Sequence, residues 1–315
     1  MNLKRLHRIY KKIFFSDKWN IGYVTQTPEE LIRTKALSGK INWLAEDPAD
    51  YCADPFVLSH NGKDVIFYEH LNHWNGLGQI NQINNFDFGT KKRVTGLVEN
   101  LHLSYPYIFE DDNEIYCIPE TARANEICLY LVNPNNLSEL TRKKVLVQGA
   151  QFVDSSLIKY NGKYWLFTNK RSCSDIFIYH SDSLAGEFVP HKMNPIPTTA
   201  KNFRSGGHLF IVNDTLYRPT QNSEISYGGS LIINKISVLT EDHFACEIDF
   251  ELLPSAPYTL GLHNISFGKN IIVIDGKKRS LSLLMPLKLV IRNYKLYRIK
   301  KMRAMAAAVV YAQAF

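Results

Sequence analysis

The sequence lacks any apolar run long enough to cross a bilayer as a helix, and its cysteines lack the spacing of metal-binding motifs. Basic residues interrupt the N-terminal apolar positions throughout, which argues against a secretory signal. Cysteine is scarce, with five residues in 315, and an odd number cannot all pair. The simplest interpretation is reduced thiols in a reducing compartment, so we expect a cytoplasmic protein.

An even spread of charge is also lacking. The formal net charge is +7, but residues 1–18 carry six Lys/Arg against one Asp, and residues 287–303 carry seven Lys/Arg with no acid. Residues 19–286 are therefore mildly acidic, at about −5. No basic stripe with interleaved aromatics runs through this middle part, so we predict no nucleic-acid partner.

The N-terminal segment has the spacing of an amphipathic helix. In MNLKRLHRIYKKIFF, apolar and basic residues fall on opposite sides of a helix. Such a helix can lie on an anionic membrane surface with its apolar side down. The alternative is a helix that packs on the folded body and leaves its basic face in water. We predict three parts: a basic amphipathic helix over 1–18, a folded domain over 19–286 and a basic tail over 287–315.

β-Prone hairpins are abundant, in a chain that is 45% apolar and 12% aromatic. In FVDSSLIKYNGKYWLFTNK (152–170), two such strands flank Asn161-Gly162, a pair that accepts the positive φ angles of a two-residue turn. Similar units occupy 53–70, 104–120 and 204–222, and a weaker unit occupies 263–276.

These units open near residues 54, 106, 154, 207 and 263, at intervals of 48 to 56 residues. A strand-rich repeat of about 50 residues is typical of propeller blades packed around a central channel. The sequence therefore predicts an all-β fold, a five-bladed β-propeller with short basic helical or extended termini. An ordinary β-sandwich with evenly spaced hairpins is the alternative.

Polar side chains occupy the open end of each unit. In an antiparallel hairpin the start of the first strand lies beside the end of the second, so five blades would aim these side chains at one mouth of the channel. The carboxylates of this predicted mouth are Asp54, Glu69, Glu120 and Asp154. The other predicted site residues are Tyr105, Lys170, Arg171, Arg204, His208, Arg218, Gln221, Tyr227 and His263.

Seven short stretches form an ordered set: WNIGYV (19–24), INWLAEDPADYCADPF (41–56), LSYPYIFE (103–110), IPE (118–120), VDSSLI (153–158), YWLF (164–167) and YRPTQ…YGG (217–229). The set resembles the N-terminal domain of plant glucosamine inositolphosphorylceramide transferases and its bacterial relatives, over roughly 19–275. The plant proteins carry, in addition, a separate glycosyltransferase domain. At a greater distance the Asp54-Pro55 opening resembles the five-bladed arabinanase, β-xylosidase and levansucrase families, which place catalytic carboxylates around the channel mouth.

The distant resemblance implies roles for three carboxylates. Asp54 matches the base or nucleophile of those hydrolases, and Asp154 matches their helper carboxylate. Glu120 is the best candidate for the acid. Making or breaking a glycosidic bond needs one carboxylate as base or nucleophile and often a second as acid or stabiliser. The structural alternatives are a strand-opening Asp-Pro turn, and ion pairs of the glutamates with Arg218 or Lys170.

The cations of the predicted mouth suit a phosphate-bearing substrate. Arginine offers a planar fork for phosphate, and Gly206-Gly207 permits close backbone approach. We expect Lys170, Arg204 and Arg218 to hold the phosphates of a nucleotide-sugar donor. The alternative for RSGGH (204–208) is a tight strand entry that needs glycine. No Asp-x-Asp pair is available to grip a sugar nucleotide through a metal ion, so we predict no metal and no other cofactor.

Two functions from different classes of enzyme follow, with a binding function as a third. The first is a glycosyltransferase, peripheral to the inner face of the membrane, that moves a sugar from a nucleotide-sugar donor to a glycan or glycolipid acceptor such as a lipid-linked surface glycan. The second is a glycoside hydrolase of the propeller type. The third is a non-catalytic glycan-binding propeller, with aromatic platforms at Trp74, Tyr105, Tyr107 and Tyr227.

Overall fold

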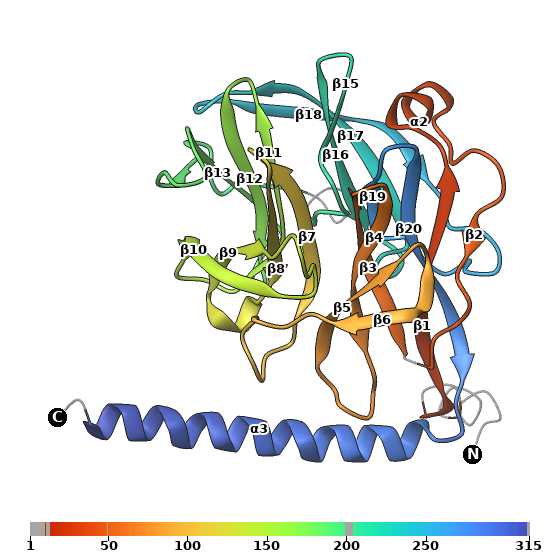
Figure 1. Ribbon diagram of the computed structural model, residues 1–315, viewed down its shortest axis with the longest axis vertical. Helices are drawn as coiled ribbons and strands as arrows, with labels where there is room; N and C mark the ends of the chain where they lie inside the picture. The colour runs from red at the N-terminus through yellow and green to blue at the C-terminus, as the bar shows by residue number, and fades with distance from the viewer. Residues whose placement is uncertain (1–9, 11–12, 49, 199–203, 314–315) are drawn as a thin grey trace.

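The described residues form an all-β body of four sheets, with two α-helices and one short 3-10 helix (Figure 1). The computed structural model describes residue 10 and residues 13–48, 50–198 and 204–313. In the C-terminal helix α3 (Met285–Gln313) it describes side chains as far as residue 302 and at residue 305. The other helices are α2 (Pro28–Thr34) and η1 (Ala122–Ala124).

Three of the sheets have four strands each, consecutive in the sequence. The second sheet contains β7 (Ser104–Asp111), β8 (Glu114–Glu120), β9 (Glu126–Val132) and β10 (Leu140–Gln148). The third contains β11 (Phe152–Tyr160), β12 (Lys163–Lys170), β13 (Ile176–Ser181) and β14 (Val189–Pro190). The fourth contains β15 (Phe210–Val212), β16 (Thr215–Asn222), β17 (Ser230–Leu239) and β18 (Phe244–Leu252).

The first sheet has eight strands and joins the two ends of the sequence. Its order is β19 (Ile265–Phe267), β20 (Ile271–Leu281), β1 (Phe15–Thr25), β3 (Tyr51–His60), β4 (Lys63–Leu71), β5 (Gly78–Asn84) and β6 (Asp87–Arg93), with β2 (Asn42–Trp43) beside β1. β1 pairs with β20 over all eleven of its residues, whereas β1 and β3 share the single pair Trp19–Tyr51.

This pairing corrects the predicted N-terminal boundary. Residues 15–18 belong to strand β1, not to the helix expected over 1–18, because Phe15 to Lys18 pair with Leu281 to Lys278 on β20. Tertiary pairing extends the strand toward the N-terminus. Most of the remainder of the predicted helix, residues 1–9 and 11–12, lies outside the described residues.

The predicted hairpins are confirmed. Each repeat unit forms an antiparallel pair of strands, β3–β4, β7–β8, β11–β12, β15–β16 and β19–β20. Both residues of four predicted turns have positive φ, as a tight hairpin turn requires: Asn61-Gly62, Asp112-Asn113, Asn161-Gly162 and Asn213-Asp214. Local turn chemistry therefore fixed these hairpins.

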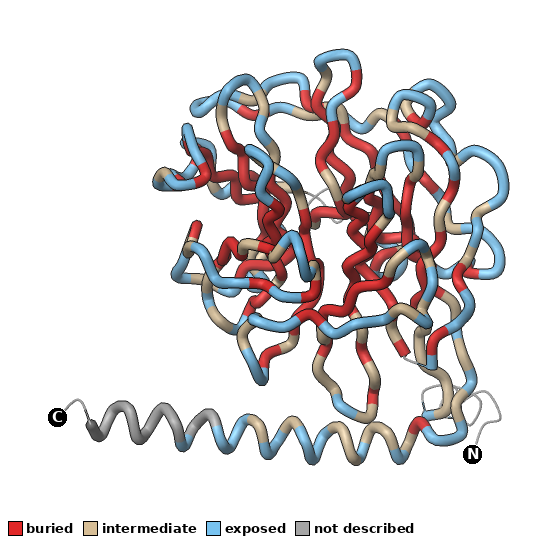
Figure 2. Tube along the Cα trace, in the orientation of Figure 1, coloured by how far each residue is buried: buried red, intermediate tan, exposed pale blue. Residues whose placement is uncertain are grey.

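The hairpins meet at their first strands, around a common centre (Figure 1). The Tyr105 hydroxyl on β7 lies 2.8 Å from Ser156 Oγ on β11 and donates to the Gly207 carbonyl at 3.1 Å. Buried residues follow these inner strands (Figure 2) and include the fully buried Phe56 and Ile265. Burial of one such side chain contributes roughly 1.5–3 kcal/mol.

Helix α3 lies along one side of the sheets and is much longer than the short terminus expected (Figure 1). Its first half is tied to Asp50, which precedes β3, and to the β4–β5 connection. Lys288 Nζ lies 2.9 Å from Asp50 Oδ1, and Lys295 Nζ donates to Asn75 Oδ1 at 3.0 Å. Among the described residues, no helix combines the length and the apolar character needed to cross a membrane.

Candidate functional site

The first strand of three hairpins opens with a β-bulge. At this point Asp54, Tyr105 and Asp154 adopt φ angles of 50°, 44° and 48°, and strand register shifts beside each of them. Gly207 opens the fourth hairpin at φ 125°. Positive φ is uncommon for non-glycine residues and persists where the surrounding structure holds it, often at functional sites.

Each bulge points its backbone N–H at a carboxylate of the neighbouring hairpin. The N–H of Tyr105 donates to Asp54 Oδ2 at 3.3 Å, and that of Asp154 donates to Glu120 Oε2 at 3.2 Å. The N–H of Asp54 donates to Asp275 Oδ2 at 3.1 Å. The bulges therefore fix three carboxylates in orientation around the open end of the inner strands.

A cavity of about 580 Å³ lies at this end. It falls within the usual size range of small-molecule sites. Seven of the predicted site residues line it: Asp54, Glu69, Glu120, Lys170, Arg171, Arg204 and Tyr227. Arg123, His102 and Leu296 of α3 line it as well.

Asp54 is the end of a buried chain of polar groups. His263 Nε2 lies 3.5 Å from Asp54 Oδ1, and His263 Nδ1 lies 2.5 Å from Asp275 Oδ2. The N–H groups of His263 and Asn264 donate to Asp275 Oδ1 at 2.9 and 3.1 Å. Trp19 stacks on the imidazole, with ring centroids 4.0 Å apart. Asp275 thus holds the ring with Nε2 directed at Asp54.

Burial controls the protonation of this chain. It raises the pKa of Asp54 to about 8, while His263 acts in the opposite direction. Burial disfavours the imidazolium, but the carboxylates of Asp275 and Asp54 outweigh it and raise the pKa of His263. A carboxyl group that titrates near neutral pH suits proton transfer.

The second buried cluster contains Glu120, Asp154 and Arg204. Arg204 Nε is ion-paired with Asp154, and Arg204 Nη2 lies 3.8 Å from Glu120 Oε2. Gln221 Nε2 donates to Asp154 Oδ2 at 3.3 Å. Burial, with the nearby Asp154 carboxylate, raises the pKa of Glu120 well above its usual value. Glu120 therefore favours the protonated form, which an acid needs, and Arg204 is largely occupied by its partners.

Other side chains form the rim of the cavity. Lys170 Nζ lies 4.0 Å from the ring centroid of Phe177, while Arg171 and Arg123 are exposed. Tyr227 is 49% exposed, and the Arg204 guanidinium lies 5.3 Å from its ring centroid. The rim therefore offers free cations and one aromatic face.

Glu69 pairs with a histidine, not with the predicted Arg218 or Lys170. His102 Nε2 lies 3.2 Å from Glu69 Oε1, and His102 Nδ1 accepts the N–H of Gly78 at 2.9 Å. Because Nδ1 accepts, Nε2 carries the proton that faces Glu69. Lys170 and Arg218, the partners that the structural alternative gave to Glu69, lie instead at the rings of Phe177 and Phe167.

Asp54, His263 and Asp275 are the described residues whose potential ligand atoms gather within 4.8 Å, as a metal ion would need. The oxygens of Asp275 already accept three backbone N–H groups. Internal donors thus satisfy this carboxylate, and the cluster fits a hydrogen-bonded chain better than a metal centre.

Residues 37–258 match the family described as "Glucosamine inositolphosphorylceramide transferase 1, N-terminal". The chain belongs to this family. It is 32% identical over 233 residues to glucosamine inositolphosphorylceramide transferase 1 of Oryza sativa subsp. japonica, covering 71% of this chain and 30% of the relative. The protein of that name from Arabidopsis thaliana is 28% identical over 253 residues, covering 73% and 33%. The chain thus spans about a third of the length of these relatives.

A solved structure shares the fold. The catalytic domain of the Coprinopsis cinerea GH62 α-L-arabinofuranosidase superposes with a TM-score of 0.50 at 11% identity, over 74% of this chain and 93% of that one. At this identity the likeness concerns the fold alone, that of the propeller glycoside hydrolases. The sheets of this chain are therefore arranged as in a propeller.

Three predicted positions lie away from the cavity in this family member. Tyr105 is completely buried, because its hydroxyl spans the centre to Ser156 and Gly207. Tyr107 is 2% exposed and donates to the Leu157 carbonyl. Neither ring can serve as a sugar platform, and Trp74 contacts α3 through Lys288, 5.9 Å from its ring.

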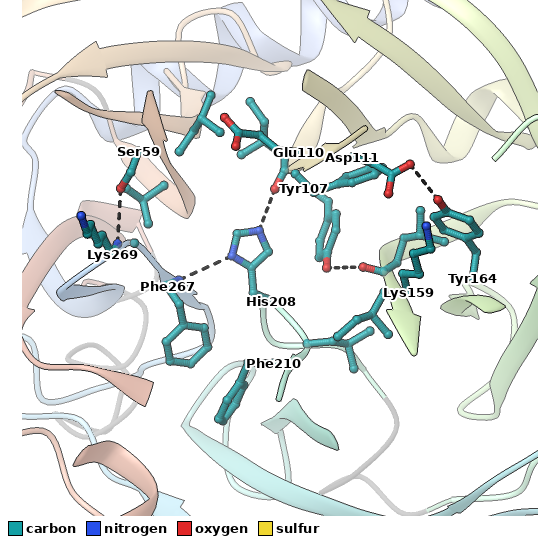
Figure 3. Close-up of a pocket in the computed structure, with 18 residues that line it drawn as sticks. Ser59, Tyr107, Glu110, Asp111, Lys159, Tyr164, His208, Phe210, Phe267 and Lys269 are labelled. Carbon is teal, nitrogen blue, oxygen red and sulfur yellow. Dashed lines mark hydrogen bonds between the residues drawn. The ribbon is translucent and has the colours of Figure 1, made fainter. Parts of the chain in front are cut away.

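His208 was predicted at the same mouth, but it lines a second cavity of about 550 Å³ (Figure 3). Its Nε2 lies 2.8 Å from the Ile108 carbonyl, and its Nδ1 lies 3.1 Å from Ser266 Oγ. Burial lowers the pKa of His208 to about 4, so the ring is neutral and donates to Ile108. His208 follows Gly207 and precedes β15, and its side chain lies in this second cavity, away from the carboxylates.

Arg218 was predicted to hold phosphate, but it is 1% exposed and does not line the cavity. Its guanidinium lies 5.6 Å from the ring centroid of Phe167 on the neighbouring sheet. On strand β16, residues 218 and 221 are three apart and face opposite sides, so Gln221 reaches Asp154 and Arg218 cannot.

The sequence interpretation missed Asp275. Asp275 lies where the β19–β20 pairing ends, near the end of the fifth repeat unit (263–276). Glu69 and Glu120 lie near the ends of their units, so the repeat contained this signal. His102 is not among the predicted site residues, although it lines the cavity. No local pattern marks it, because it lies in a connection that folds back onto the end of β4.

Proposed function

We propose that this chain is a carbohydrate-active propeller that transfers a sugar from a nucleotide-sugar donor to a glycan or glycolipid acceptor. One observation carries the proposal: Asp54 and Glu120, both with raised pKa values, meet a cationic rim in one cavity of about 580 Å³. Proton-transfer groups and phosphate-binding groups are the two requirements of such a transfer.

The architecture in this proposal has five blades. The eight-stranded sheet divides between β1 and β3, where one residue pair joins them. Each part then has four strands, like the other three sheets. The N-terminal strand β1 completes the last blade by pairing with β20, which would close the ring.

Asp54 is the base on the acceptor hydroxyl in this proposal. His263 stabilises its carboxylate form from 3.5 Å, and Asp275 holds His263 in place. The N–H of Tyr105 directs one oxygen of the carboxylate. Glu120 donates a proton to the leaving group of the donor. The Asp154–Arg204 ion pair lies beside Glu120 and influences its charge.

Lys170, Arg171 and Arg123 hold the donor phosphates. These three cations line the cavity, and the two arginines are exposed. Arg204, predicted for the same role, is engaged by Asp154 and Glu120. The basic ends and the five free cysteines support the predicted location at the cytoplasmic face of a membrane.

A glycoside hydrolase is the second candidate. The engagement of Arg204 by two carboxylates favours it, because fewer cations of the cavity then remain for phosphate. In that case the same carboxyl groups would act on a neutral oligosaccharide.

Thermal shift separates the two candidates. The full chain is heated with nucleotide sugars, free nucleotides or neutral oligosaccharides. A ligand at about 100 times its Kd stabilises the folded state by about 2.7 kcal/mol, which raises Tm by several degrees. We expect nucleotide sugars to raise Tm, and the Lys170→Ala/Arg171→Ala variant to lose the shift. Arg142→Ala, at an exposed cation of β10, is the matched control. A shift with oligosaccharides alone would overturn the transferase proposal.

A further inference from the structure

Helix α3 presents two different faces. Lys288, Arg292 and Leu296 recur at intervals of four residues and share one face. That face touches the sheets: Lys288 reaches Asp50 and Leu296 lines the cavity. A Cβ atom placed on Gly76 would lie 2.4 Å from Arg292 Cγ, which shows how closely the helix approaches the β4–β5 connection.

The opposite face is apolar and exposed. Leu287, Val290, Tyr294 and Tyr297 are spaced by three or four residues, and they are 50%, 66%, 63% and 64% exposed. We call these four residues the apolar stripe. No described residue of the sheets covers it. Large contiguous apolar surfaces of this kind mark interaction sites.

Positive charge accompanies the stripe. Arg298, Lys300 and Lys301 are exposed on the same helix, and residues 285–313 contain no acidic residue. Apolar side chains along one face of a cationic helix match an anionic lipid surface. Charges spread along the helix would make a spanning orientation costly, so the helix would lie in the plane of the surface.

The described residues just before β1 lie beside the start of α3. The N–H of Ser282 donates to the Phe14 carbonyl at 2.8 Å. Tyr10 and Ile13 in this part of the chain are 42% and 38% exposed. Exposed apolar side chains thus precede β1 as well as follow β20.

We propose that α3 lies in the interface of an anionic bilayer with the apolar stripe buried, and that it holds the cavity mouth beside the lipid surface. The cavity rim at Leu296 and the stripe lie on opposite faces of one helix, whose diameter is about 10–12 Å. A head group anchored in the bilayer can span that distance. The proposal that α3 docks on a bilayer does not depend on the proposed function. The acceptor class that follows from it, a glycan on a membrane lipid, rests on the proposed function.

Vesicle sedimentation tests the docking. The full chain is mixed with phosphatidylcholine vesicles that contain or lack phosphatidylglycerol. We expect binding to the anionic vesicles that weakens in high salt. Substitution of the stripe by asparagine (Leu287→Asn, Val290→Asn, Tyr294→Asn, Tyr297→Asn) should weaken binding at least about tenfold, since it removes the buried apolar surface. Ile248→Asn/Leu253→Asn, at two exposed apolar positions at and after β18, is the matched control and should bind normally.

Fluorescence quenching locates the bound face. A Tyr297→Trp variant should be quenched by brominated lipids, and an Ile248→Trp variant should not, relative to the wild-type protein. Equal binding by the stripe variant and the wild-type protein would overturn the proposal. The proposal would also be overturned if the protein formed a dimer in solution that did not bind vesicles and that the stripe substitutions dissociated. Asp54→Asn should bind vesicles normally, so failure of the proposed chemistry and failure of docking give different results.

Discussion

At the scale of single residues, the protonation of the site depends on the burial of its ionisable side chains. Asp54 lies between His263 and the N–H of Tyr105, and its neighbours Glu69, Asp154 and Asp275 are acidic. Burial and these carboxylates favour the protonated acid, while His263 favours the carboxylate. The balance places the titration of Asp54 near neutral pH, where a base is useful.

Asp54→Asn is expected to lower transfer by about 10²–10⁴-fold, because a positioned base contributes about that much. Its effect on stability has the opposite sign. The pKa of Asp54 is raised from 3.8 to about 8, so between these values the folded state binds more protons than the unfolded state. Stability therefore falls as pH rises through this window.

Asp54→Asn should abolish the part of this decline in stability that is due to Asp54. The Tm of the variant should therefore exceed that of the wild-type protein by an amount that grows from pH 5 to pH 8. Glu120 and His263, whose pKa values are also raised, keep a residual decline in both proteins. Calorimetry across pH measures the difference. A constant Tm difference across this window would show that Asp54 does not titrate as described.

His263→Gln is expected to move the pH profile of transfer. His263 lowers the pKa of Asp54, so its loss should raise that pKa above about 8 and shift the rising limb of the rate to higher pH. His60→Gln, near Glu110 at 3.8 Å and outside the cavity, is the control. A lower rate with an unmoved limb would mean that His263 only supports the fold.

At the scale of elements, the turn and the bulge have different roles at the two ends of a hairpin. The Asn-Gly and Asx-rich turns set the pairing at one end, where both turn residues accept positive φ. At the other end the bulge interrupts the pairing and directs one N–H toward the neighbouring hairpin. The strands are therefore regularly paired between turn and bulge, and the carboxylates lie at the bulged end of the hairpins.

The helix α3 is an element of another kind. Its contacts with the sheets are polar, through Lys288 and Lys295, while its apolar stripe faces outward. A helix that merely stabilised the sheets would bury its apolar face against them. Its orientation is the reason for assigning it a lipid surface.

At the scale of the whole molecule, the N-terminal strand joins the two ends of the chain. β1 pairs with β20 from Phe15 to Thr25 and buries Trp19 and Ile21. The chemistry depends on this pairing, since Trp19 stacks on His263. At the N-terminal end, the residues that can be removed without loss of this pairing are therefore those before residue 15.

Deletion of residues 1–14 should leave the fold intact and reduce vesicle binding, because it removes five Lys/Arg and no paired strand residue. Deletion of residues 1–25 removes β1 and exposes the backbone edges of β20 and β3. That protein should lose cooperative unfolding. Circular dichroism melts of both deletions provide the measurement. A cooperative melt for the longer deletion would contradict the role of β1.

The sequence by itself determined the hairpins and seven of the residues that line the cavity. Turn residues act locally, so Asn61-Gly62 and Asn161-Gly162 predict their turns without any knowledge of the rest of the fold. The repeat then placed Asp54, Glu69 and Glu120 at equivalent ends, and all three line one cavity. Positions that depend on the period of the repeat were therefore predictable.

The tertiary structure alone decided which way individual side chains face. Successive strand residues face opposite sides, and a bulge adds one residue that shifts this alternation. Alternation alone therefore does not decide that Tyr105 and His208 lie away from the cavity that Asp54 lines. Ion pairs such as Arg204 with Asp154 join residues 50 positions apart, and the approach of α3 to the cavity depends on long-range packing. Such contacts form only when distant hairpins meet, so no local pattern in the sequence encodes them.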